Sequence, residues 1–172
     1  VQSNVLTVTI KRSAQTLTVH SLDMVRLAGS RQLDVSTNAS LSSGGTYSYQ
    51  VVGGSGVGAV NASGLFTGTG LGSVDIEVSI SGDSNYNPAT VVHTIQVVDL
   101  ALVPQSVSVV PEGTTRLFSL QLRPLGTTLN SGVQFSLSGN LAASSAYSIP
   151  SSVFLPLGSS SVDVLMSALS DD

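Results

Sequence analysis

The chain of 172 residues contains no cysteine and no tryptophan, and only 9% of its residues are charged, against about 25% in an ordinary soluble domain. Without cysteine no disulfide can form, so sheet hydrogen bonding and apolar burial must hold the fold together. Six lysines and arginines are too few for a surface that tracks phosphates, so we expect no nucleic-acid partner. No apolar run approaches the roughly 20 residues of a membrane helix, so we expect no membrane insertion.

Hydrophobic residues nevertheless make up 41% of the chain, which is enough to form cores. Apolar and polar residues alternate over short segments, and clusters of Gly, Asn or Ser separate these segments. This period of two is typical of strands and predicts an all-β fold. In the clearest case Val74, Ile76, Val78 and Ile80 share one strand face. The other predicted strands are 5–10, 15–19, 32–36, 46–52, 90–98, 106–109, 115–122, 133–137, 153–155 and 161–166.

The order of the strands divides the chain into three parts. A strand ends at residue 10, and a short polar junction leads to a new strand at 15–19. The same plan returns after residues 94–97. We therefore expect 1–10 to be the last strand of a preceding domain or a donor strand, 11–98 to be one whole domain, and 99–172 to begin the next.

Two motifs carry a resemblance in the central part of the chain. Residues 82–90 read Gly-Asp-Ser-Asn-Tyr-Asn-Pro-Ala-Thr and precede a strand at 93–97. Residues 60–68 read Val-Asn-Ala-Ser-Gly-Leu-Phe-Thr-Gly, a strand, a glycine turn and a second strand. With these motifs, residues 11–98 resemble the bacterial immunoglobulin-like (Big-type) repeats of large bacterial surface proteins. The resemblance implies a β-sandwich within a tandem array.

The last part of the chain resembles a different family. Residues 109–114 read Val-Val-Pro-Glu-Gly-Thr, and residues 147–153 read Tyr-Ser-Ile-Pro-Ser-Ser-Val. With the alternation at 118–122 and the acidic pair at 171–172, they are similar to a Calx-beta domain, which commonly continues with further strands. The expected fold class is therefore all-β, with tandem immunoglobulin-like β-sandwiches of which the second, at 99–172, is a partial Calx-beta-like one.

The same resemblance raises the question of calcium. Some Calx-beta domains bind the ion through a glutamate in a turn and aspartates that end a strand, which implies Glu112, Asp171 and Asp172 as metal candidates. Calcium takes about six to eight oxygen ligands, and the loop at 138–145 contributes no acid. The alternative is that Glu112 only forms a turn and both aspartates are solvated. No other cofactor is expected.

A second acidic segment is better interpreted as structural. Asp83, Asn85 and Asn87 place side-chain oxygens at alternate positions, as the first half of a calcium loop does. Pro88 stands where such a loop needs Gly, and its last position lacks the required Glu. We therefore expect a structural corner in which these side chains cap backbone groups, while Tyr86 fills the end of the sandwich and its hydroxyl bonds to backbone.

The remaining chemistry-bearing residues form no recognisable site. His20 and His93 have no cysteine or second histidine at metal-ligand spacing, and the chain contains no Gly-x-Ser-x-Gly elbow, so we expect no catalysis. Asn38 and Asn61 each begin an Asn-x-Ser glycosylation pattern, which is short enough to arise by chance. Residues 61–64 are also a predicted turn.

Three functions fit these observations. The first is a non-catalytic structural or adhesive module of an extracellular or cell-surface bacterial protein, which acts as a stalk or spacer with neighbouring domains of the array as partners. The second is a self-assembling fibre subunit, in which a strand of one copy completes the unfinished sandwich of another. The third is a carbohydrate-binding accessory module that uses Tyr47 and Tyr49, which share one strand face. The donor strand of the second hypothesis would carry Val5, Leu6, Val8 and Ile10.

Overall fold

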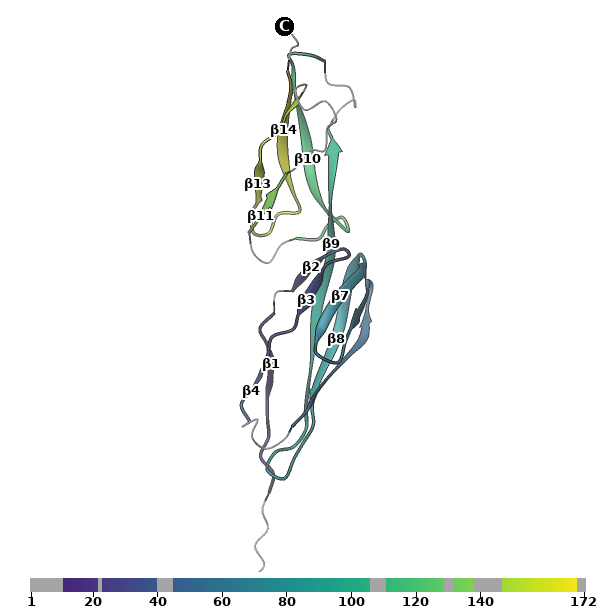
Figure 1. The fold of residues 1–172 in the computed structure, drawn as a ribbon, viewed down its shortest axis with the longest axis vertical. Coiled ribbons are helices and arrows are strands. Elements are labelled where there is room, and N and C mark those ends of the chain that lie inside the picture. Colours follow the sequence, from purple (N-terminus) through teal and green to yellow (C-terminus); the bar gives the residue numbers. More distant parts are fainter. Residues whose placement is uncertain are drawn as a thin grey trace, which may run out of the picture. The chain divides into compact units, whose positions relative to one another are not determined.

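The computed structural model describes residues 11–21, 23–39, 45–105, 111–128, 132–137 and 147–169 (Figure 1). Within these ranges the chain forms several antiparallel sheets and no helix, which confirms the all-β prediction. In the same part of the chain no helix is long and apolar enough to cross a membrane. The chain folds into two compact units, Val1–Val97 and Val98–Asp172. The predicted strands 5–10 and 106–109 lie outside the described residues.

The first unit contains short strands near its start and longer strands near its end. One sheet has β8 between β5 and β9, with β2 also paired to β9. A second sheet has the order β3-β7-β6, and β1 pairs with β4. The strands are β1 (Leu17–Val19), β2 (Met24–Arg26), β3 (Ser30–Gln32), β4 (Val35–Thr37), β5 (Tyr47–Gly54), β6 (Val57–Val60), β7 (Leu65–Gly70), β8 (Gly72–Ile80) and the first part of β9 (Ala89–Pro104).

The core of this unit lies between its sheets. The predicted inward face of β8 is confirmed, because Val74, Ile76 and Val78 are fully buried and Ile80 is almost so. Phe66 of β7 belongs to the same cluster, so the β3-β7-β6 sheet and the β8–β9 sheet share one core. Burial of this contiguous apolar surface, rather than any covalent link, stabilises the unit.

The second unit is built on the remaining part of β9. Its larger sheet has the order β12-β14-β10-β9, and β11 pairs with β13 in a separate two-stranded sheet. Buried side chains come from both sheets, Leu120 and Val164 from the larger and Leu155 from the smaller. The strands are β10 (Thr115–Arg123), β11 (Val133–Ser136), β12 (Tyr147–Ser148), β13 (Ser152–Leu155) and β14 (Ser161–Ala168).

One predicted strand of the first unit is wrong. Residues 32–36 do not form a single strand, because β3 ends at Gln32 and β4 begins at Val35. β3 pairs with β7, whereas β4 pairs with β1, so the chain changes sheets at this point. At the interruption the Leu33 amide still has a backbone partner, because it donates to the Gly64 carbonyl at 2.9 Å. The alternation of apolar residues continues through the break, and this is why the sequence resembled one strand.

The expected end of β9 is also wrong. The sequence indicated a strand over 90–98 and a new start near residue 100, but β9 runs to Pro104 without interruption. Its residues 89–97 pair with β8 and its residues 99–104 pair with β10. The apolar and β-branched residues on both sides of Asp99 favour an extended chain, and one acidic residue does not break it. The strands β2 and β12 were not predicted, because two or three residues give no measurable period.

Candidate functional site

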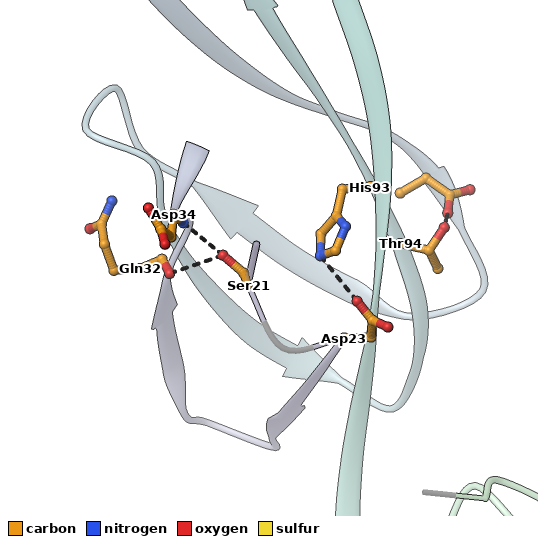
Figure 2. A network of polar contacts seen from close by, with 7 residues as sticks. Ser21, Asp23, Gln32, Asp34, His93 and Thr94 are labelled. Carbon is orange, nitrogen blue, oxygen red and sulfur yellow. Dashed lines mark hydrogen bonds and ion pairs between the residues drawn. The ribbon is translucent and has the colours of Figure 1, made fainter. Parts of the chain in front are cut away.

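A polar network joins the turn after β1 to the interruption between β3 and β4 (Figure 2). The Ser21 hydroxyl accepts a hydrogen bond from the Asp34 amide at 2.7 Å and donates to the Gln32 carbonyl at 3.4 Å. The His20 amide donates to the Asp34 carbonyl at 2.8 Å. These contacts replace the ladder hydrogen bonds that the chain loses where it changes sheets. The Ser21 hydroxyl therefore already serves the backbone with both its donor and its acceptor capacity.

His93 lies on the face of β9 that also carries the buried Ile95 and Val97, and Figure 2 shows it beside Asp23. Its side chain is 14% exposed, and its Nε2 lies 3.5 Å from Asp23 Oδ1. The backbone of Asp23 is tied to β9, because the Gln96 amide donates to the Asp23 carbonyl at 2.7 Å. The next residue, Thr94, points to the other face and donates to the Asp75 carboxylate at 2.6 Å. His93 thus joins the β2 region to β9 through a partly buried polar contact.

His20 makes a separate contact on the surface. Its Nε2 lies 2.7 Å from the Ser36 hydroxyl, across the β1–β4 pair. These contacts do not form a Ser-His-Asp proton relay, because the Ser36 hydroxyl contacts His20 whereas the Asp23 carboxylate contacts His93. Within the described residues, no group of three His, Cys, Asp or Glu side chains could hold a metal ion.

The segment around Asp83 forms a tight corner. Asp83 Oδ1 accepts hydrogen bonds from the Asn85 amide at 2.6 Å and from the Tyr86 amide at 2.8 Å. The Asp83 amide in turn donates to the Tyr86 carbonyl at 3.0 Å. The Asp83 side chain therefore caps the turn. Such local side-chain bonds give the backbone an alternative to the hydrogen bonds of a regular strand. Asn85 and Asn87 contribute through their backbone groups, and Tyr86 is half-buried. The bond from its hydroxyl to backbone stays a prediction.

The start of the first unit is attached to this corner. Ser13 forms a parallel bridge to Tyr86, with its amide donating to the Asn85 carbonyl at 2.7 Å and its carbonyl accepting from the Asn87 amide at 2.9 Å. Gln15, only 8% exposed, adds side-chain donation to the Asn87 carbonyl at 2.6 Å and to the Ser81 carbonyl at 3.3 Å. The first described segment is thus tied to the chain that leads into β9.

The sequence analysis did not identify Gln15 as a buried hydrogen-bonding residue, although the sequence contains a signal for this role. In the alternating segment 15–19, Gln15 occupies the same face as Leu17 and Val19. An amide at an inward position must find hydrogen-bond partners, because burying an unpaired polar group is costly. The partners come from a corner more than sixty residues further along, and no local pattern names them.

Tyr47 and Tyr49 lie on one face of β5, and that face is turned toward the core. Their rings stack with centroids 6.5 Å apart and an interplanar angle of 29°, and both pack against the buried cluster. The Tyr47 hydroxyl is buried without a hydrogen-bond partner among the described residues. The Tyr49 ring lies over Gly64, where a Cβ would be 2.8 Å from the ring. Binding of a sugar by this pair stays a prediction, and only the partly exposed parts of the rings could serve it.

The position of Tyr49 gives a testable pH dependence. Burial raises the pKa of the Tyr49 hydroxyl above its ordinary value of 10.0, and the neighbouring Tyr47 adds to the effect. The folded state therefore holds this proton longer than the unfolded state, so stability is lost as pH rises from the unfolded pKa toward the folded one. In the Tyr49→Phe protein, the unfolding midpoint should therefore fall less steeply than in the wild type as the pH rises between about 9 and 11. Identical slopes for the two proteins would contradict this assignment.

The structure describes only some of the residues that were predicted to bind calcium or to form the donor strand. Glu112 is exposed in the turn before β10, where the Thr114 amide donates to the Pro111 carbonyl at 3.2 Å. Asp171 and Asp172 lie outside the described residues, so the predicted metal set stays a prediction. Residues 1–10, with the four donor positions predicted there, also lie outside them.

Comparison with known proteins adds no assignment. No protein-family model matches the chain, and no curated protein matches it.

Proposed function

We propose that the chain is a non-catalytic structural element of an extracellular surface protein, and that it acts as a stalk or spacer in a tandem array of immunoglobulin-like domains. Its resemblances to Big-type and Calx-beta domains and its low charge favour this function. The observation that carries the proposal is the attachment of Ser13 and Gln15 to the corner that leads into β9. An element of this kind must keep its fold while its ends are pulled apart.

The geometry of the attachment suits that task. Ser13 and Tyr86 run parallel, so tension between the start of the unit and β9 shears the bridge instead of opening it from one end. Two backbone hydrogen bonds and two from Gln15 then carry the force together. Beyond the corner, β9 is held to β8 by nine consecutive residue pairs, Gly72↔Val97 to Ile80↔Ala89. The force thus enters the best-paired ladder of the unit.

Gln15→Leu should lower the free energy of unfolding of the first unit by about 1–3 kcal/mol. The substitution removes two partly buried hydrogen bonds, and the Ser81 and Asn87 carbonyls lose a partner whose own side chain is only 8% exposed. Gln32→Leu is the control, because the Gln32 amide also donates to two carbonyls but is exposed. Its cost should stay below about 1 kcal/mol. Equal losses of unfolding free energy in urea denaturation would show that the attachment stabilises the unit no more than an exposed side-chain contact does.

One observation favours the fibre subunit as a second candidate. Leu102 of β9 pairs with the buried Leu120 and therefore lies on the same, inner face of the second unit, yet it is 48% exposed. A strand from another copy could cover such an apolar position while extending the sheet. Electron microscopy of the protein with and without residues 1–10 tests this function. Filaments that need these residues support it, and soluble monomers in both samples rule it out.

A further inference from the structure

The turn between β6 and β7 is organised by one side chain, that of Asn61. Its Oδ1 accepts hydrogen bonds from the Ser63 hydroxyl at 2.7 Å, the Leu65 amide at 2.9 Å and the Ser63 amide at 3.0 Å. The Gly64 amide closes the turn on the Asn61 carbonyl at 3.0 Å, with Gly64 at a φ of 81°. This is an Asx turn, in which a side-chain carbonyl replaces a backbone one.

The other half of the Asn61 amide has no structural task. Within the described part of the chain, the hydrogen bonds of this side chain all use Oδ1, and none uses Nδ2. Asn61, Ala62 and Ser63 are all exposed at the tip of the hairpin. A substituent on Nδ2 would keep the carbonyl oxygen and its three hydrogen bonds. The turn therefore tolerates a modified Asn61 in its folded form.

The same residues form one of the two Asn-x-Ser patterns of the chain. The hydroxyl that the pattern requires is in contact with the amide that would be modified, at 2.7 Å. At the second pattern, Asn38 Oδ1 accepts from the Thr16 amide at 2.8 Å, which is a contact with another segment, and Ser40 lies outside the described residues. At Asn61 the structure brings the asparagine and the serine of the pattern together in an exposed turn.

We propose that Asn61 is an N-glycosylation site, modified on Nδ2 by a sugar with an activated anomeric carbon. In the reaction the bond from Nδ2 to the sugar C1 forms, and the bond from C1 to the phosphate oxygen of the donor breaks. The Nδ2 proton goes to a base of the modifying enzyme, and no oxidation or reduction occurs. The donor is either a nucleotide-activated hexose or a polyprenyl-pyrophosphate-linked oligosaccharide, which share this chemistry. The proposal is independent of the stalk function.

The test uses the full chain, produced in a bacterium together with either class of N-glycosyltransferase and directed to the compartment where that enzyme acts. Intact mass and peptide fragmentation should show one glycan on Asn61 with at least one enzyme class, and the class identifies the donor. Asn61→Asp keeps the capping oxygen but removes Nδ2, so it should lose the glycan and unfold at the same temperature as the unmodified wild type. Ser63→Ala should lose the glycan, and Ser63→Thr should keep it.

Three results would overturn the proposal. The first is an unmodified Asn61 with both enzyme classes, and the second is a glycan at Asn38 alone. The third is undiminished modification of Asn61 in the Ser63→Ala protein, because the hydroxyl contact would then be irrelevant. If Asn61→Asp destabilises the fold, the thermal midpoint reveals it, and the Ser63→Ala and Ser63→Thr pair still decides the outcome.

Discussion

Phe66→Ala is expected to lower the free energy of unfolding of the first unit by about 3–5 kcal/mol. The Phe66 ring is fully buried in the cluster shared by the two sheets. It also lies directly on Gly58 of β6, where an added Cβ would be 2.5 Å from a ring carbon. Removing the ring leaves a cavity that the strands cannot close without breaking their register. Urea denaturation monitored by circular dichroism measures the loss.

Phe154→Ala provides the matched control for this prediction. The Phe154 ring also lies on a glycine, Gly132, but its side chain is 57% exposed on β13, so its removal leaves no enclosed cavity. We expect a loss of about 1 kcal/mol or less in the second unit. Similar losses for the two phenylalanines would mean that the cluster around Phe66 is not the core that stabilises the first unit.

Gly54→Ala is expected to cost about 3 kcal/mol or more, through strain at a special backbone position and a steric overlap. Gly54 has a φ of 111°, which side chains of L-residues rarely adopt. A Cβ there would lie 2.1 Å from the Ser73 carbonyl oxygen and 2.8 Å from its carbon. Both atoms belong to the backbone of β8, so relief requires a shift of the β5–β8 pair.

Gly113→Ala separates the two parts of that cost. Gly113 also has a positive φ, 69°, but an added Cβ would meet no atom within 4 Å. The backbone term alone should cost this variant about 1–2 kcal/mol. Chemical denaturation of both proteins gives the difference. If Gly54→Ala costs no more than Gly113→Ala, the added Cβ does not meet the Ser73 carbonyl, and steric overlap between β5 and β8 contributes nothing.

The sequence was most informative where one physical signal dominates. β8 could be predicted with its inward face, because four apolar residues alternate with polar ones and the strand is buried on one side. The turn at 61–64 was equally accessible, since Asn and Gly favour it for independent reasons. In both places the local preference of the chain agrees with its tertiary environment.

The features that the sequence does not reveal have a common origin in long-range pairing. The break after Gln32 depends on β7 and on Ser21, and neither is near it in the sequence. The inward orientation of Tyr47 and Tyr49 follows from the packing of β5 on the core, whereas strand alternation alone says only that they share a face. Gln15 is understood only once its partners in the distant corner are known.

The central proposal is that the first unit resists tension through the attachment of Ser13 and Gln15 to the corner before β9. Single-molecule pulling tests it most directly, and the absence of cysteine lets introduced cysteines at the chain ends serve as unique handles. We predict that Gln15→Leu lowers the unfolding force of the first unit, while Gln32→Leu leaves that force unchanged. Equal forces for the wild type and Gln15→Leu would contradict the account, because the attachment would then carry no load.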